Sequence, residues 1–215
     1  MLSYHDLQRI AISPTTELCE IMTRNLSDKG NGHHNYTKLY HHLFKNIRHR
    51  PLDILEIGIG SINPSIPSNM RGNRFYSPGA SIRGWHEYFP NAQIYCCDID
   101  NSILNFEEPR IHGFYLDQTN DEMLSMITKN GFLKNKKFDI IIDDGLHHWP
   151  TNFKVLKHLL PKLKNNGYYF IESIPSIEYN YNYIDFNVLN GKEYQYVKLP
   201  NDKNNWDNNL FMVHL

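Results

Sequence analysis

The sequence has little cysteine, no long apolar run and no recognisable leader. Only three of its 215 residues are cysteines, and they are Cys19, Cys96 and Cys97. An odd, small number of cysteines does not form a disulfide framework, and it favours a reducing cytoplasm. No apolar stretch approaches the roughly 20 residues that a membrane helix needs, and the N-terminus lacks the apolar core of a signal peptide. We therefore expect a soluble, cytoplasmic protein without a membrane partner.

The sequence also has almost no net charge. Its 22 lysines and arginines nearly balance 23 aspartates and glutamates, which gives a formal net charge of −1. Proteins that bind a phosphate backbone cluster their basic residues on one surface, whereas these lysines are scattered among asparagines. We expect no nucleic-acid partner. The sequence does not give the oligomeric state, and a homo-oligomer stays open.

Short apolar runs predict the strands of a parallel sheet. They are DILEIG (53–58), QIYCCD (93–98), FDIIIDD (138–144), GYYFIE (167–172) and the weaker HGFYLD (112–117). Strands of a parallel sheet are covered on both faces, so their sequences are continuously apolar rather than alternating. The stretches between the runs are long enough for helices. This pattern predicts an α/β fold with a doubly wound, mostly parallel Rossmann-like sheet.

Helical periodicity fills the connections. Residues 151–167 keep helical spacing up to a predicted stop at Asn166-Gly167, and this segment reads as a crossover helix. Ahead of the sheet, Ser13-Pro14 predicts a helix start, with proline at the first helical position. Residues 36–47 have apolar residues at spacings of three and four.

These elements predict two parts of the chain. We expect residues 1–50 to form an N-terminal helical cap or lid, and residues 51–215 to form the Rossmann-like domain, which a C-terminal strand pair closes. Residues 61–81 form a long loop rich in Pro, Ser, Asn and Gly. Loops of this length inside a compact domain are usually functional.

Acidic residues stand at the ends of the predicted strands. They are Glu56, Asp98, Asp117, Asp143, Asp144 and Glu172. The carboxyl ends of parallel strands share one edge of the sheet, where open α/β folds bind their ligands. One acid at a strand end is more often a helix cap or the start of a solvated loop. An acid at every strand end instead favours one shared site.

The glycine turn after the first strand, EIGIGS, is incomplete as a dinucleotide motif. The third glycine position is Asn63, and Asp98 follows Gly58 by about 40 residues instead of the roughly 20 of that motif. This disfavours NAD. An acid after the second strand can accept hydrogen bonds from both ribose hydroxyls, which points to an adenosyl ligand without a pyrophosphate.

Taken together, these motifs resemble the class I S-adenosylmethionine-dependent methyltransferases, and more narrowly the macrocin- and mycinamicin-type sugar O-methyltransferases. The resemblance rests on SDKGNGHHNYTKLYHHLF, LEIGIG, GASIRGWHEYFPNAQIYCCDID, LDQTN, FDIIIDDGLHH and LLPKLKNNGYYFIES. It covers most of the chain, and the combination is more specific than any one motif.

The resemblance implies a site for S-adenosyl-L-methionine and a divalent ion, usually Mg²⁺. Glu56, Gly58 and Gly60 would hold the methionine end, Asp98 the ribose, and Asp117 with Gln118 the adenine; Ser81 and Asp143 complete the implied cofactor residues. The implied metal ligands are Asp144, Asp143 and Glu172. His147 would be the general base beside Asp144. The chain departs from the family pattern at Ser173, which stands where a second carboxylate commonly follows Glu172.

The chemistry of these residue types agrees with the resemblance. A sugar hydroxyl is a poor nucleophile when protonated, so methyl transfer needs a base, a cation that lowers the hydroxyl pKa, or both. Carboxylate oxygens suit Mg²⁺, and a histidine accepts a proton near neutral pH.

Several other residues have two interpretations. His148 and Trp149 either contact the acceptor or pack under the following helix. Arg71 and Arg74 either hold a substrate phosphate or are solvated. The pairs His33-His34 and His41-His42 favour a solvated or lid role over a metal site, because adjacent helical residues point apart and no acid stands at ligand spacing.

The leading hypothesis is an S-adenosylmethionine-dependent O-methyltransferase that acts on a sugar hydroxyl, with a nucleotide-linked or otherwise phosphorylated sugar as acceptor, in polysaccharide or glycoconjugate biosynthesis. A metal-dependent hydrolase or oxygenase could use the same acids. A non-catalytic nucleotide-binding protein could retain the fold alone, and Ser173 is the feature that most favours these alternatives.

Overall fold

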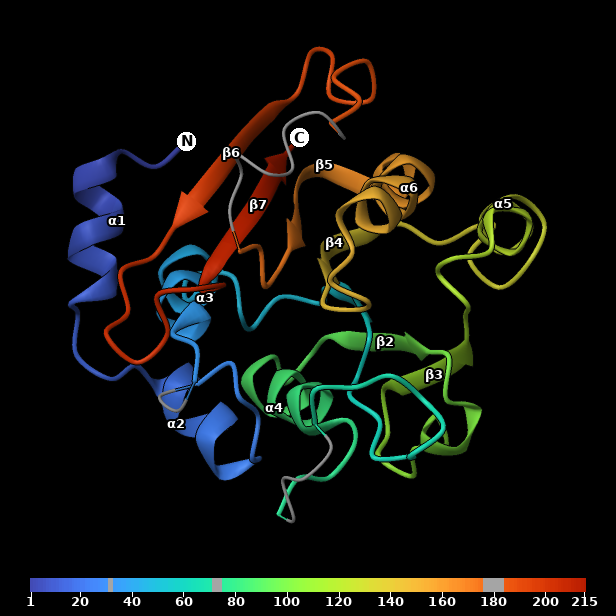
Figure 1. Cartoon of the computed structure of the whole chain (residues 1–215), viewed down its shortest axis with the longest axis horizontal. Helices are drawn as coiled ribbons and strands as arrows, with labels where there is room; N and C mark the ends of the chain where they lie inside the picture. Colours follow the sequence, from blue (N-terminus) through green and yellow to red (C-terminus); the bar gives the residue numbers. More distant parts are fainter. Residues whose placement is uncertain (31–32, 71–74, 176–183) are drawn as a thin grey trace.

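A seven-stranded sheet forms the centre of the computed structural model, which describes residues 1–30, 33–70, 75–175 and 184–215. The strand order is β3-β2-β1-β4-β5-β7-β6 (Figure 1). The strands are β1 (Asp53–Ile57), β2 (Gln93–Asp98), β3 (Ile111–Tyr115), β4 (Phe138–Asp143), β5 (Leu163–Ile171), β6 (Glu193–Lys198) and β7 (Asn209–His214). Strands β1 to β5 are parallel, whereas β7 is antiparallel to both β5 and β6. The predicted doubly wound sheet and its closing strand pair are confirmed.

Helices cover both faces of this sheet. On one face lie α1 (Tyr4–Ala11), α2 (Glu17–Arg24), α3 (Tyr36–Phe44) and α4 (Ala80–Tyr88); on the other lie α5 (Asp121–Lys129) and α6 (Trp149–Leu159). Two single 3-10 turns, η1 (Asn101–Ile103) and η2 (Leu160–Lys162), complete the elements. Successive strand residues point to opposite faces. Ile54 therefore joins the core under α1 to α4, while Leu55 joins the core under α5 and α6.

Two helix boundaries differ from those that the sequence predicts. The helix expected at Ser13-Pro14 begins instead after Thr16, whose hydroxyl accepts a hydrogen bond from the Cys19 amide at 3.2 Å. The crossover helix α6 ends at Leu159 rather than at Asn166. Pro161 cannot donate to a helical hydrogen bond and its ring clashes with the preceding turn, so the chain leaves the helix there and enters β5 early.

The two ends of the chain meet at the β6 edge of the sheet (Figure 1). The Leu2 amide donates to Gln195 Oε1 at 3.0 Å, and Gln195 Nε2 donates back to the Leu2 carbonyl at 2.7 Å. All three cysteines are buried free thiols, as expected. Among the described residues, no helix has the length and apolar character needed to cross a bilayer.

Candidate active site

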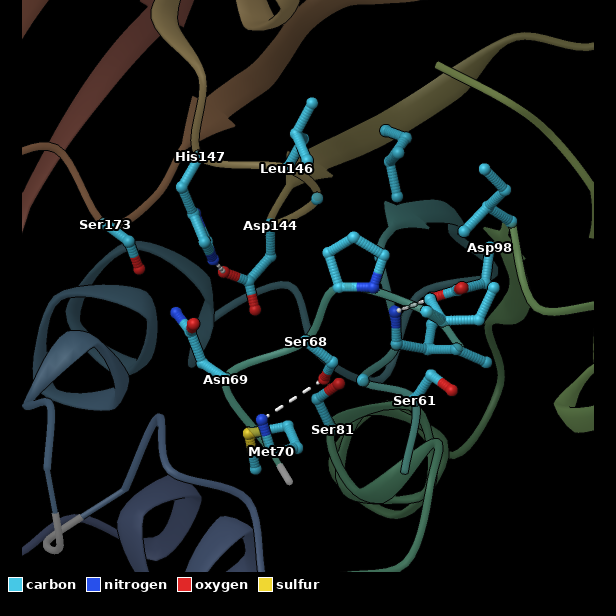
Figure 2. A pocket seen from close by; sticks show the side chains of 18 of the residues that line it. Ser61, Ser68, Asn69, Met70, Ser81, Asp98, Asp144, Leu146, His147 and Ser173 are labelled. Atoms are coloured by element: carbon cyan, nitrogen blue, oxygen red, sulfur yellow. Dashed lines mark hydrogen bonds and ion pairs between the residues drawn. The ribbon is translucent and has the colours of Figure 1, made fainter. Parts of the chain in front are cut away.

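A cavity of about 770 Å³ opens at the carboxyl edge of the parallel strands (Figure 2). From neighbouring strands β1 and β4 the chain continues in opposite directions, to β2 on one side and to β5 on the other. Such a reversal separates the loops above it and leaves a crevice. The walls come from the turn after β1, the described parts of the 61–81 loop, the ends of β2 to β4, and Ser27, Asp28, Lys29, His33 and His34 ahead of α3.

The glycine turn after β1 packs tightly against the loop after β4. Gly58 and Gly60 have φ angles of +81° and +76°, a region that favours glycine. A Cβ atom on Gly58 would lie 2.4 Å from the Asp144 carbonyl oxygen. The amide of Ile59 donates to Asp98 Oδ2 at 2.9 Å, so the strand-end acid holds the turn in place.

Asp98, Asp117 and Gln118 line the same side of the cavity. The second oxygen of Asp98 accepts from the Asp100 amide at 2.9 Å. Asp117 Oδ1 accepts from the Thr119 amide at 2.9 Å, so part of its role is to cap a turn. Gln118 Oε1 accepts from the Leu146 amide at 3.1 Å, but its Nε2 has no hydrogen-bond partner among the described residues. An unpaired amide donor fits a ligand with a ring nitrogen acceptor, such as adenine.

Glu56 lies beneath the cavity rather than in its wall. It is fully buried, and it accepts hydrogen bonds from Ser81 Oγ at 2.6 Å and from the Trp85 indole N–H. Ser81 itself lines the cavity. Burial is the main reason that the pKa of Glu56 is raised. Glu56 thus orients Ser81 from below, and the serine is the group that faces a ligand.

Lys29 is the charged residue of this site that the sequence analysis missed. Its side chain is only 2% exposed, and its Nζ lies 2.6 Å from Glu172 Oε2 and 3.6 Å from Glu56 Oε1, with a further short hydrogen bond to Asp144. Strand alternation explains why these three acids meet at Lys29. Glu56, Asp144 and Glu172 all point to the face of the sheet that the N-terminal helices cover. The only sequence signal for Lys29 was its place in the SDKG motif. A lysine is rarely buried unless acidic side chains pair with it.

The pKa directions indicate which acid balances the lysine. Burial opposes the charge on Lys29, but Asp144, Glu172 and Glu56 outweigh it and raise its pKa well above the usual value. Burial also acts to raise the pKa of Asp144, yet Lys29 and His147 lower it overall. The pKa of Glu172 is raised, mainly by burial. Asp144 is therefore the ionised partner of Lys29, and Glu172 keeps a proton more readily.

The structure brings together two of the three predicted metal ligands. Asp144 and Glu172 meet at Lys29, whereas Asp143 points to the α6 face. Asp143 is the last residue of β4 and Asp144 follows it, so their side chains point to opposite faces of the sheet. Asp143 Oδ2 has no partner among the described residues, and burial raises the pKa of this carboxyl to about 7.

The donor set nevertheless fits a hard divalent cation. Asp144 and Ser173 line the cavity, and Figure 2 places them beside each other with His147. Glu172 lies just behind, where its Oε1 accepts a hydrogen bond from Tyr40 at 2.5 Å. Carboxylate and hydroxyl oxygens suit Mg²⁺, which retains several waters when protein ligands are few. The Lys29 ammonium must move aside for such an ion, because it lies between the two carboxylates.

His147 lines the cavity, where Figure 2 shows it beside Asp144. Its Nε2 lies 3.8 Å from Asp144 Oδ1, and its side chain is 28% exposed. The residue has a φ of +54°, a left-handed conformation that is uncommon outside glycine. Such strain is retained where the surrounding structure fixes it, often at functional sites.

The remaining predicted site residues lie elsewhere. His148 precedes α6 and pairs its Nδ1 with Thr151 Oγ1 at 2.9 Å. Trp149 is buried against Phe153, with a distance of 4.9 Å between ring centroids. Neither lines the cavity, which favours packing over acceptor contact. Arg71 and Arg74 lie outside the described residues.

Comparison with known proteins identifies the homologues of the chain. No protein-family model matches it. It is 33% identical over 172 residues to the 8-demethyl-8-(2-methoxy-alpha-L-rhamnosyl)-tetracenomycin-C 3'-O-methyltransferase of Streptomyces olivaceus, covering 78% of this chain and 39% of the relative. It is 32% identical over 165 residues to the mycinamicin VI 2''-O-methyltransferase of Micromonospora griseorubida, covering 74% and 36%. The chain thus spans about two fifths of the length of these relatives.

Solved structures agree in fold. The MycE methyltransferase of the mycinamycin biosynthetic pathway, in complex with Mg and SAH, superposes with a TM-score of 0.62 at 30% identity, over 80% of this chain and 40% of that one. An O-methyltransferase from Bacillus cereus in complex with SAH shares the fold at 11% identity, with a TM-score of 0.56 over 96% of this chain and 94% of that one. The fold is that of class I S-adenosylmethionine-dependent methyltransferases. Within that class, the chain is a homologue of the macrocin-, mycinamicin- and tetracenomycin-type sugar O-methyltransferases, as the motifs predicted.

Proposed function

We propose that this protein transfers a methyl group from S-adenosylmethionine to a hydroxyl of a sugar. The observation that carries the proposal is one cavity with two chemically different sides. One side has a glycine turn, Asp98 and a Gln118 amide without a partner in the described part of the chain, which suit an adenosyl cofactor. The other has His147 beside the ionised Asp144, which suits removal of a proton from an acceptor.

The residues on the cofactor side are proposed to position S-adenosylmethionine, and they take no part in proton transfer. The Gly58 turn lets the backbone approach the ligand closely, while Asp98 retains lone pairs for the ribose hydroxyls after accepting two backbone amides. Asp117 and Gln118 are placed for the adenine. Methyl transfer is a displacement at carbon, and its rate depends on how well the acceptor oxygen and the methyl group are aligned.

His147 is proposed as the base that takes the hydroxyl proton. Its exposed edge reaches the cavity, and the carboxylate of Asp144 favours the imidazolium that forms on proton transfer. A magnesium ion held by Asp144, Glu172 and Ser173 would lower the pKa of a bound hydroxyl. The buried Lys29 keeps Asp144 ionised.

The helical segment 1–50 is proposed to act as a cap on this site. It supplies Lys29 from the loop before α3, and Tyr40 from α3 itself. Without this segment, Asp144 and Glu172 would lose their buried cation and would face water.

The acceptor is proposed to be a sugar that is already attached to an aglycone. Two relatives are named for a rhamnosyl-tetracenomycin and an olivosyl-oleandolide, names that join a sugar to a larger carrier, and a third is named for mycinamicin VI. A nucleotide-linked sugar is the competing acceptor, and it requires an anion-binding group.

A methyl-transfer assay separates these acceptors. The full chain would receive S-adenosylmethionine with a labelled methyl group, Mg²⁺, and either a rhamnosylated polyketide or a rhamnose nucleotide. We expect label in the glycoside and none in the nucleotide sugar. Label in the nucleotide sugar alone would overturn the acceptor assignment but keep the reaction. No label in any sugar, with hydrolysis or no turnover instead, would overturn the reaction.

A further inference from the structure

A second group of metal-ligating side chains lies at the same cavity and shares no residue with the acids that contact Lys29. It consists of His33 and His34, just ahead of α3, and Asp207, in the connection between β6 and β7. One ligand atom from each lies within 4.8 Å of the others. From the sequence, His33 and His34 were expected to point apart on a helix, with no acid at ligand spacing. The pair instead lies before the helix, with ring centroids 4.6 Å apart, and the acid comes from the far end of the chain.

A side-chain amide stands at the centre of this group. Asn204 Nδ2 lies 2.6 Å from Asp207 Oδ1, 3.1 Å from His33 Nε2 and 3.3 Å from His34 Nδ1. An amide nitrogen has only two hydrogens to donate. Its orientation is fixed from behind, because Asn204 Oδ1 accepts from the backbone amides of Trp206 and Asp207 at 3.2 and 3.3 Å. More acceptors converge on this point than one amide can satisfy.

We propose that His33, His34 and Asp207 form a binding site for a divalent transition metal, with Zn²⁺ as its representative. Two imidazoles and a carboxylate match the ligands that zinc takes, at about 2.0–2.2 Å from the ion. The ion would take the place of the Asn204 amide. His33 and Asp207 are not buried, so their side chains have room to close the gap from the present 4.8 Å.

The ring of His34 is buried, and its Nδ1 lies among side-chain amides. Its Nδ1 also lies 3.3 Å from Asn208 Oδ1, so this nitrogen has an alternative acceptor when it carries hydrogen. Metal binding requires the other tautomer, and it makes Asn208 Oδ1 a further oxygen beside the ion.

This site differs in ligand chemistry from the acids of the proposed catalytic centre. Asp144 and Glu172 offer oxygen alone and suit Mg²⁺, whereas the histidine site offers nitrogen and suits zinc. All three proposed ligands line the cavity, so a metal with three protein ligands keeps an open position that faces it. Such an ion also links the segment before α3 to the β6–β7 connection.

The test is a Zn²⁺ titration of the full chain with Mg²⁺ in large excess, which occupies sites made only of oxygen ligands. We expect one Zn²⁺ per chain. Asp207→Asn and His33→Ala should each weaken it by at least about tenfold, as loss of one ligand implies. Asn204→Ala should bind at least as tightly as the wild type, because the amide no longer competes. His42→Ala removes an exposed histidine of α3, and its affinity should be unchanged.

Visible absorption of the Co²⁺ form provides a readout of geometry, and Asp207→Asn should alter it. The hydrogen bond from Tyr36 to the main-chain carbonyl of residue 207 does not involve the substituted side chain. Absence of stoichiometric Zn²⁺ binding, or equal affinity in wild type, Asp207→Asn and His33→Ala, would overturn the site. Binding of S-adenosylhomocysteine is measured separately without zinc, so failure here is distinguishable from failure of the proposed function.

Discussion

The two sides of the cavity are built in different ways. On the cofactor side, the strand ends themselves place Gly58 and Asp98, and backbone amides satisfy the carboxylate. On the acceptor side, the acids Asp144 and Glu172 depend on Lys29, which arrives from a segment more than 100 residues away in sequence. The first side follows from the sheet. The second exists only when the helical segment is packed onto it.

The difference has a physical consequence for charge. Asp98 neighbours backbone donors, which are fixed wherever the sheet forms. Glu172 is buried and the Asp144 side chain is only 21% exposed, and both lie beside a single ammonium, so their ionisation depends on that one side chain. Variants on the acceptor side should therefore affect turnover and stability, whereas variants on the cofactor side should affect ligand affinity.

The largest effect is expected on turnover from His147→Ala. Loss of a general base should lower the rate by about 10²–10⁴-fold, with little change in cofactor affinity because the ring faces the acceptor. Steady-state rates and calorimetry with S-adenosylhomocysteine would be compared. His148→Ala is the matched control, since its ring pairs with Thr151 and does not line the cavity. Equal losses in both variants would place the base elsewhere.

Lys29→Met should destabilise the fold by about 3–5 kcal/mol at neutral pH, because it leaves buried carboxylates without their cation. Asp144 has a lowered pKa, so its stabilising contribution is present above its ordinary value and is lost as the pH falls through the folded value. The deficit should shrink in acid. Denaturant unfolding at several pH values measures it.

The control for Lys29 is Lys164→Met. Lys164 also contacts two acids, Asp53 and Asp139, each at 2.8 Å, but its side chain is 35% exposed. Exposed pairs contribute roughly 0–1 kcal/mol. Added Mg²⁺ should stabilise Lys29→Met more than the wild type, because the ammonium no longer occupies the acids. A similar cost for both lysines would contradict the buried-cation account.

Asp143 belongs to neither side of the cavity, so its titration can be followed separately. Burial raises the pKa of its carboxyl to about 7, so the stability it contributes is present below its ordinary pKa and is lost as the pH rises through about 7. The wild type should lose roughly 2–4 kcal/mol across this window. Asp143→Asn cannot ionise and should lack that decline, which unfolding curves at pH 4 to 8 would reveal. Asp139→Asn should keep it.

The smallest effect is expected from Asp98→Ala, on affinity for S-adenosylhomocysteine. Loss of a charge-assisted acceptor costs about 1.5–3 kcal/mol, or roughly 10–150-fold in Kd. Asp98→Asn should lose less, since its amide oxygen still accepts from Ile59. Asp121→Ala, on the exposed start of α5, should bind normally. An unchanged Kd in Asp98→Ala would remove the ribose assignment.

Local patterns predicted the sheet and the cofactor side. Apolar runs predicted the five parallel strands, and the rule for carboxyl edges predicted that Asp98 and Asp117 lie at one cavity. The residues that the sequence did not predict depend on contacts between distant segments of the chain. Lys29 becomes a buried partner only after the N-terminal segment packs, and His33 meets Asp207 only because the segment before α3 packs against the β6–β7 connection. The position of Asp143 apart from Asp144 could have been predicted, because alternation along a strand points consecutive residues to opposite faces.

The most direct test of the central claim is calorimetric titration of S-adenosylhomocysteine into the wild-type chain, with NADH titrated as the competing ligand. The two-sided cavity predicts one S-adenosylhomocysteine per chain and no saturable binding of NADH, because the glycine turn lacks the third glycine of a dinucleotide site. Saturable NADH binding, with no heat from S-adenosylhomocysteine, would contradict the account.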